Sequence, residues 1–236
     1  MAKFDGKLTW LGHAMFLIEA RSGARLVLDP FIEGNPKFPK GFDLSRVDVI
    51  AATHGHSDHF GASGLALARE TGATVCGVFE LALWLGEKGW TKVSGMNKGG
   101  TQTISDFTIH MTQAVHSSGT SRDDRNPPSD PCGFVVETGG LRIYHAGDTA
   151  VFSDMALIGE LLRPDVALLP IGDFYTMGPR SAAKACELLG VPTAIPMHFG
   201  TFPALAGTAA AFREELKKRG LATEVIELVP GESWSG

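Results

Sequence analysis

"VDVIAATHGHSDHFG", residues 47–61, joins an apolar run to a dense cluster of polar side chains. The run at 47–53 is continuous and rich in β-branched residues, which predicts a buried β-strand. If that strand ends at Thr53, the next two histidines are two positions apart in an extended chain and point the same way. Neighbouring imidazoles beside a carboxylate suit a divalent ion such as zinc. The cluster consists of His54, His56, Asp58 and His59.

Three more polar residues lie where other predicted strands end. His116, Asp148 and His198 each come at the end of an apolar or alternating run. Strand ends at one edge of a sheet are places where side chains from distant parts of a chain can meet around a ligand. We therefore expect these three residues to join the cluster.

The rest of the chain alternates between strand and helix patterns, with strands in runs at first and helices between the later ones. Two mixed sheets with helices outside fit this order better than one open parallel sheet. No polar linker divides the chain, so we expect a single domain over residues 1–236. The expected strands are 7–12, 14–20, 24–29, 47–53, 73–77, 101–104, 107–115, 132–138, 141–147, 165–171, 193–198 and 222–228. The expected helices are 63–72, 78–89, 155–163, 180–190 and 208–220.

Composition narrows the function classes. The 236 residues carry a formal net charge of -5 without a strongly basic patch, which argues against nucleic acid or an anionic membrane as the main partner. No run of eighteen apolar residues appears, so we expect no membrane span. Three widely spaced cysteines favour free thiols and a cytoplasmic location.

These motifs, in this order, resemble the metallo-β-lactamase superfamily. The resemblance rests on "HGHSDH", on His116, on "GDT" with Asp148 and on a final His198. Flanking words such as "WLGHA", "HSSG", "YHAGDT" and "PMHFGTFP" are similar to small bacterial metal-dependent hydrolases of the ascorbate-6-phosphate lactonase branch. They are more distantly similar to N-acyl phosphatidylethanolamine phospholipase D.

The resemblance implies an α/β (α+β) fold, a four-layer αββα sandwich of two mixed sheets with the site along one edge. It also implies two divalent ions, zinc first, with manganese, iron or nickel as alternatives. The first ion would be held by His54, His56 and His116. The second would be held by Asp58, His59 and His198, with Asp148 bridging the two.

The chemistry that follows is hydrolysis of an ester or lactone bond in a small molecule by a hydroxide shared between two ions. We expect Asp58, His54, His56 and Asp148 to act in catalysis. One alternative is a phosphodiesterase with the same site. Another is a metal-binding module without turnover, and the presence of all seven ligand positions counts against it. A homo-oligomer stays open.

Several further residues are candidates to line or support the site. Asp29 in "VLDP" resembles an aspartate that ends an early strand of the fold and supports the metals, with a role in the turn as the alternative. His13 and His145 could each line the pocket or hydrogen-bond a ligand residue. Asp173 and Tyr175 lie in a polar stretch that either contacts substrate or only precedes a helix.

Overall fold

The computed structural model describes residues 4–119 and 125–236, and these form two seven-stranded sheets. The first sheet has the order β14-β1-β2-β3-β4-β5-β6 and the second β13-β12-β11-β10-β9-β8-β7. The strands of the first sheet are β1 (Gly6–Trp10), β2 (Phe16–Ala20), β3 (Arg25–Leu28), β4 (Val49–Ala51), β5 (Thr74–Val78), β6 (Val93–Met96) and β14 (Ser233–Trp234). Those of the second are β7 (Thr101–Ile104), β8 (Phe107–Gln113), β9 (Cys132–Thr138), β10 (Leu141–His145), β11 (Val166–Pro170), β12 (Thr193–Met197) and β13 (Glu224–Val225).

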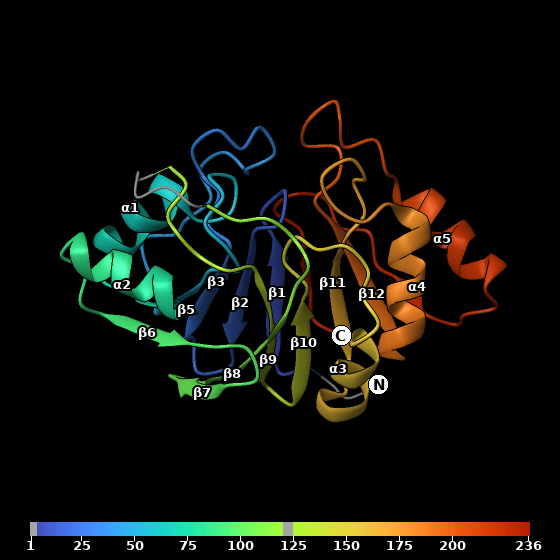
Figure 1. Cartoon of the computed structure of the whole chain (residues 1–236), viewed down its shortest axis with the longest axis horizontal. Coiled ribbons are helices and arrows are strands. Elements are labelled where there is room, and N and C mark those ends of the chain that lie inside the picture. The colour runs from blue at the N-terminus through green and yellow to red at the C-terminus, as the bar shows by residue number, and fades with distance from the viewer. Residues whose placement is uncertain (1–3, 120–124) are drawn as a thin grey trace.

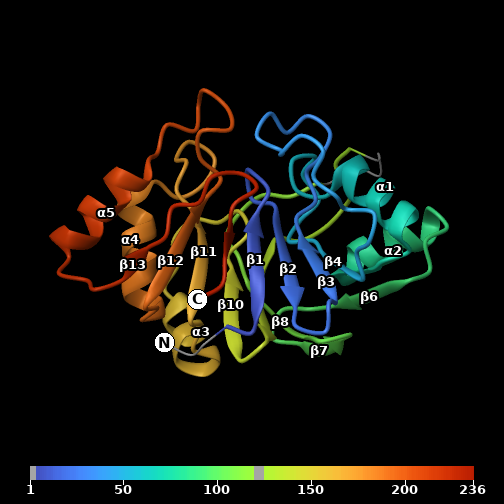
Figure 2. The same cartoon turned by 180° about the vertical axis from the view of Figure 1, so that it is seen from behind.

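Helices cover the outer faces of the two sheets. In Figures 1 and 2, α1 (Gly61–Thr71) and α2 (Phe79–Glu87) lie on one flank of the molecule. The opposite flank carries α3 (Met155–Leu162), α4 (Pro179–Leu189) and α5 (Ala209–Lys218). The predicted four-layer αββα sandwich of mixed sheets is therefore confirmed.

The core has two layers, which explains why several strands are apolar throughout. In β11, Val166 and Leu168 face the other sheet, whereas Ala167 and Leu169 pack toward the helices α4 and α5. Successive side chains of a strand point to opposite faces, so a strand covered on both faces needs an apolar residue at each position.

Strand direction decides where the polar residues gather. Because β2 is antiparallel to both β1 and β3, and β4 is parallel to β3, the strands β1, β3 and β4 run the same way. In the second sheet, β8, β10, β11 and β12 likewise share one direction. The connections that follow these strands gather along the upper edge of the molecule in Figure 1.

The structure corrects the predicted elements at the sheet edges. The strands β6 and β14 were not predicted, and the strand expected at 222–228 pairs only over Glu224–Val225. The sequence "VSGM" of β6 is half exposed and lacks alternation, so its pairing with β5 comes from the tertiary fold. Among the described residues, no helix is long and apolar enough to cross a membrane.

Candidate metal centre

The candidate ligands lie in the connections at the shared strand ends. The cluster follows β4, His116 follows β8, Asp148 follows β10 and His198 follows β12. His198 adopts a positive φ of 54° directly after its strand. Non-glycine residues seldom occupy this left-handed region, and such strain is concentrated at functional sites. The sharp turn takes the chain out of the sheet at the point where the ligands meet.

Asp148 lies at the centre of the assembly. Its Oδ2 is 3.2 Å from Nε2 of His59 and 3.1 Å from Nε2 of His198. The same oxygen is 3.5 Å from Nε2 of His116. Three histidines from three separate connections thus meet one carboxylate oxygen.

The described residues form three overlapping groups whose ligand atoms lie within 4.8 Å of one another. These groups are His54–His56–His116, His54–His59–Asp148 and His13–Asp58–His59–His198. His54, His59, Asp148 and His198 are buried, whereas the side chain of Asp58 is 32% exposed and His56 and His116 are half-buried. The site therefore opens to solvent over Asp58, His56 and His116.

Buried atoms in the cluster test whether metal ions fit here. Oδ1 of Asp148 and Nδ1 of His198 are buried and have no hydrogen-bond partner among the described residues. Nε2 of His59 and Nε2 of His198 are also buried, and each has only the close contact with Oδ2 of Asp148, which falls outside hydrogen-bond geometry. Buried polar atoms are normally satisfied, so several orphans at one point require an explanation. Divalent ions supply it, since imidazole and carboxylate are ligands that zinc and similar transition metals accept.

The protonation states mostly agree with this interpretation. Burial and the neighbouring His59 hold the pKa of His54 well below its ordinary value. Burial alone would raise the pKa of Asp148, but His198 and His59 outweigh it and bring that pKa well below its usual range. Neutral imidazole and ionised carboxylate are the forms that bind metals.

His59 differs, because two carboxylates face it. Burial would lower its pKa, but the charges of Asp148 and Asp29 raise that pKa well above the ordinary value. A cation held beside Nε2 would reverse this preference, because it repels the proton from that nitrogen. The negative charges of Asp148 and Asp29 therefore need a positive partner at this point. Either a proton on His59 or a bound metal ion supplies it.

Asp29 organises the base of the cluster. Nδ1 of His59 donates to its Oδ2 at 2.8 Å, and the backbone N–H of Thr53 donates to its Oδ1 at 2.7 Å. The Thr53 hydroxyl donates to Oδ2 at 2.7 Å and lies 3.0 Å from Nδ1 of His54. Because both Nδ1 atoms are engaged, Nε2 is the nitrogen that each ring turns toward the other candidate ligands. Nε2 of His54 lies 2.9 Å from Nδ1 of His56, and Nε2 of His59 lies 3.2 Å from Oδ2 of Asp148.

His145 lies next to the site but does not face it. Its Nε2 donates to the carbonyl oxygen of Ala14 at 2.8 Å, and its Nδ1 accepts from the backbone N–H of Gly147 at 3.1 Å. Both nitrogens are thus used in holding the turn that carries Asp148. His13, in contrast, reaches into the cluster, where its Nε2 lies 3.2 Å from Oδ2 of Asp58.

Asp173 and Tyr175 lie in the loop that follows β11. Both side chains are exposed, and the hydrogen bonds of Asp173 are to the backbone of its own loop. That loop is tied to the site through the backbone, because the N–H of Met177 donates to the carbonyl of Thr149. The structure therefore gives these two side chains no contact with the candidate ligands.

The loop that connects β8 to β9 lies partly outside the described residues, namely at 120–124. Its described part packs on the ligand segment, where the Ser118 hydroxyl accepts from the N–H of Gly55 at 3.3 Å. A Cβ at Gly55 would lie 1.9 Å from the carbonyl oxygen of Pro127. Only glycine allows this approach, which keeps the residues on either side of it, His54 and His56, under the loop.

Sequence reasoning missed Thr53 and Thr201, whose hydroxyls contact residues of the cluster. In the sequence Thr53 signals only the end of a strand, although its hydroxyl links Asp29 to His54. Thr201 belongs only to a flanking motif in the sequence, and its hydroxyl meets His13. Neither has a local signal beyond its position near a candidate ligand.

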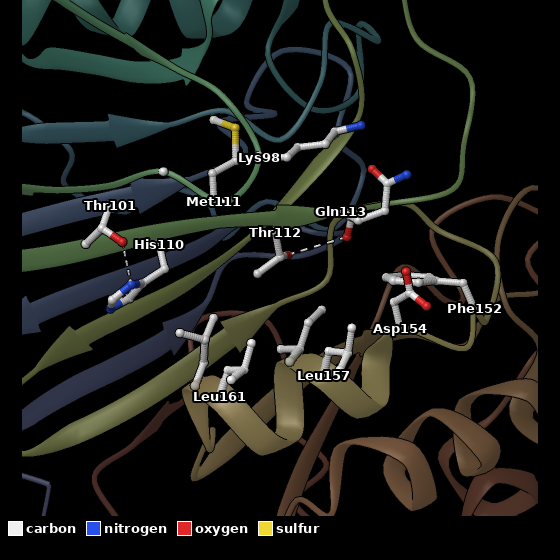
Figure 3. Close-up of a pocket in the computed structure, with 14 residues that line it drawn as sticks. Lys98, Thr101, His110, Met111, Thr112, Gln113, Phe152, Asp154, Leu157 and Leu161 are labelled. Carbon is white, nitrogen blue, oxygen red and sulfur yellow. Dashed lines mark hydrogen bonds between the residues drawn. The ribbon is translucent and has the colours of Figure 1, made fainter.

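A largely apolar hollow lies elsewhere in the described structure. A groove of about 320 Å³ runs between β8 and α3, where Figure 3 shows Leu157 and Leu161 projecting from the helix toward the strand that carries His110. Every group of candidate ligands found among the described residues lies instead at the loop edge of the sheets. The groove is therefore separate from the candidate metal centre.

Comparison with known proteins places this geometry in a class. The family model described as the Beta-lactamase superfamily domain matches residues 7–198, a range that includes every candidate ligand. The chain therefore belongs to the metallo-β-lactamase superfamily, as the motifs predicted. More narrowly, it belongs to the UPF0173 metal-dependent hydrolases. A member of that family from Herpetosiphon aurantiacus is 48% identical over 234 residues, which are 97% of each protein.

Other relatives agree. A UPF0173 metal-dependent hydrolase of Archaeoglobus fulgidus is 44% identical and is aligned over 97% of this chain and 98% of that protein. Igni18, a metallo hydrolase from Ignicoccus hospitalis, has a solved structure that matches with a TM-score of 0.83 at 35% identity, over 97% of each chain. An isothiocyanate hydrolase from Delia radicum gut bacteria matches at 19% identity with a TM-score of 0.74 over 98% of each chain, and shows the shared fold alone. The chain is thus a metal-dependent hydrolase, while the ascorbate-6-phosphate lactonase branch stays a prediction.

Proposed function

We propose that this chain hydrolyses an ester or lactone bond of a small molecule with two divalent ions. The first would be held by His54, His56 and His116, and the second by Asp58, His59 and His198. The position of Asp148 carries this proposal, because its Oδ2 lies within 3.5 Å of histidines from both groups. A carboxylate in that place can contact both ions. Zinc is the ion we favour, with manganese, iron or nickel as alternatives.

Two divalent ions held by these residues would supply a water of lowered pKa and would polarise the oxygen of the bond under attack. The chain's own residues supply position and proton transfer. Asp58 is the carboxylate that faces solvent at the mouth of the site, so it can orient the water and carry its proton. His54 is buried, and His56, whose Nδ1 lies 2.9 Å from Nε2 of His54, is half-buried.

The surroundings of Asp58 favour a neutral carbonyl group at the bond under attack. The ring of His13, which contacts Asp58, meets Phe31 at a centroid distance of 5.5 Å and Phe202 at 5.7 Å. Phe31 and Phe202 come from different loops, and Phe202 is 37% exposed. An aromatic wall suits the neutral carbonyl group of a lactone or ester better than a phosphodiester anion. The motif resemblance to lactonases points the same way.

One assay plate tests this proposal. The metal-reconstituted protein is incubated with a phosphorylated sugar lactone and with a chromogenic phosphodiester, each with and without chelator. We expect lactone opening that chelator abolishes and that is lost in His54→Ala and Asp148→Asn. Cleavage of the phosphodiester alone would replace the proposal with the phosphodiesterase alternative. If neither substrate reacts while the protein still holds two ions, the metal site stands and the proposed substrate classes fall.

The remaining expectations concern partners and location. We propose a small molecule as the partner, with neither nucleic acid nor membrane involved, and a homo-oligomer stays open. The three cysteines are buried free thiols, which supports the predicted cytoplasmic location.

A further inference from the structure

His13 occupies a conformation that its backbone does not prefer. It lies between β1 and β2 with φ at 56°, and its side chain is completely buried. Two donors hold its carbonyl oxygen, namely Nε1 of Trp10 at 2.9 Å and the backbone N–H of His198 at 3.0 Å. The strained turn is thus fastened directly to a candidate ligand residue.

Both ring nitrogens of His13 have partners in other loops. Nε2 lies 3.2 Å from Oδ2 of Asp58, and Nδ1 lies 3.0 Å from the hydroxyl of Thr201. An ionised carboxylate can only accept, so Nε2 carries the hydrogen. In the neutral ring Nδ1 then accepts from Thr201, which fixes both the tautomer and the orientation of the ring.

In this arrangement His13 orients the carboxylate of Asp58 and does not bind a metal ion itself. Its ligand atom is close enough to those of Asp58, His59 and His198 to join them around one ion. A nitrogen that donates its hydrogen to Asp58 has no lone pair for a metal, however. Holding one oxygen of the carboxylate fixes the plane of the group, and with it the direction of the other oxygen.

Within the described part of the chain, His13 contacts the ligands of the second ion and not those of the first. Through its ring and carbonyl it joins the loops that carry Asp58 and His198, both assigned to the second ion. The ligands assigned to the first ion are oriented by other groups of the described chain. Their side-chain partners are Thr53, His59, Asp148 and one another. A change at His13 should therefore affect the two ions unequally.

We propose that His13 is a positioning residue that sets the affinity of the second ion through Asp58, and so decides whether this chain holds one ion or two. The proposal rests on the two-ion function proposed above. It assigns the "LGHA" turn a role that the metal ligands alone do not explain. Loss of a group that orients a metal ligand typically weakens metal binding tenfold to a hundredfold.

The test is a calorimetric titration of metal-free protein with zinc, with ions counted by native mass spectrometry. We expect two binding events in the wild type. In His13→Ala the second event should weaken about tenfold to a hundredfold, with the first unchanged. His13→Gln places an amide N–H near the position of Nε2 and should restore most of the affinity. His110→Gln, on β8 outside the cluster, is the matched control and should equal the wild type.

A second pair of variants covers the case in which His13→Ala does not fold. Thr201→Val removes the hydroxyl that orients the ring and should weaken the second event, whereas Thr201→Ser should keep it. Wild-type affinities in His13→Ala, or in Thr201→Val where His13→Ala is unfolded, would overturn the proposal. An equal loss of affinity for both ions would overturn it too. If His13→Gln bound the second ion as weakly as His13→Ala, His13 would be a metal ligand, and the proposal would fall as well. One ion in the wild type would instead overturn the two-ion function itself.

Discussion

Oδ2 of Asp29 lies 2.8 Å from Nδ1 of His59, and both side chains are fully buried beneath the candidate ligands. The same carboxylate binds Thr53, whose hydroxyl meets His54. One residue at the end of β3 therefore orients histidines of both ion groups. Orientation of this kind raises metal affinity without any direct bond to the metal.

Replacing Asp29 with asparagine tests this orientation. Asp29→Asn keeps the volume but removes the charge and offers His59 a weaker acceptor. We expect zinc affinity to fall by about tenfold to a hundredfold, measured by calorimetry. Asp165→Asn is the control, because Asp165 also accepts a backbone N–H, that of Arg142, at the start of a strand remote from the site. Equal zinc affinity in both variants would remove Asp29 from the site.

Gly55 gives a test of packing around the ligands. A Cβ at this position would meet the carbonyl oxygen of Pro127 at 1.9 Å, so Gly55→Ala must displace the loop or the ligand segment. We expect a loss of about 1–3 kcal/mol in the free energy of unfolding, measured with urea, together with reduced activity. Gly86→Ala is the matched control, since a Cβ there meets nothing within 4 Å inside helix α2. That change should instead stabilise the protein by about 0.5–1 kcal/mol. Similar effects of the two changes would contradict the packing argument.

The metal-free protein should lose stability as the pH falls below about 6.5. Burial, with a contribution from His198, lowers the pKa of His13 to about 4, so between these values the unfolded chain binds a proton that the folded chain does not. The free energy of unfolding therefore decreases as pH falls, and His13 contributes on the order of 3 kcal/mol to the decrease. His13→Gln should flatten the profile measured by urea unfolding at pH 4 to 7, whereas His110→Gln should follow the wild type. Parallel profiles for wild type and His13→Gln would refute this assignment.

Removal of metal should lower thermal stability. Bound ions would give partners to the buried, unpartnered Oδ1 of Asp148 and ring nitrogens of the cluster. A ligand at a thousand times its Kd stabilises a protein by about 4 kcal/mol per site. For a chain of this size that corresponds to a rise in Tm of roughly 8–16 °C per site, measured by calorimetry with zinc and with chelator. Identical Tm values in the two conditions would show that no ion binds the folded chain.

Much of the fold could be predicted because its signals are local. Strands such as Val166–Pro170 are apolar throughout, and helices such as Pro179–Leu189 are bounded by proline and glycine. Edge strands carry no such signal. Ser233–Trp234 becomes a strand only because it pairs with Leu8 and Thr9, more than 220 residues earlier. Its two residues hold no periodicity that a sequence could display.

The candidate site likewise has a part that the sequence predicts, the ligands, and a part that it does not, the contacts that support them. Four candidate ligands lie within six consecutive positions, and three more follow strands, so a pattern of residue types was enough to find them. The supporting contacts depend on partners far away in the sequence. Nδ1 of His13 meets a hydroxyl 188 residues later, and its Nε2 meets a carboxylate 45 residues later. Only folding determines which nitrogen faces which atom.

The central claim is that Asp148 lies between two divalent ions. The most direct measurement is a crystal of the zinc-loaded protein, with anomalous diffraction recorded at the zinc absorption edge. We predict two peaks flanking Asp148 about 3.5–4 Å apart, one beside His54, His56 and His116 and the other beside Asp58, His59 and His198. A single peak, or peaks that do not contact Asp148, would contradict the account.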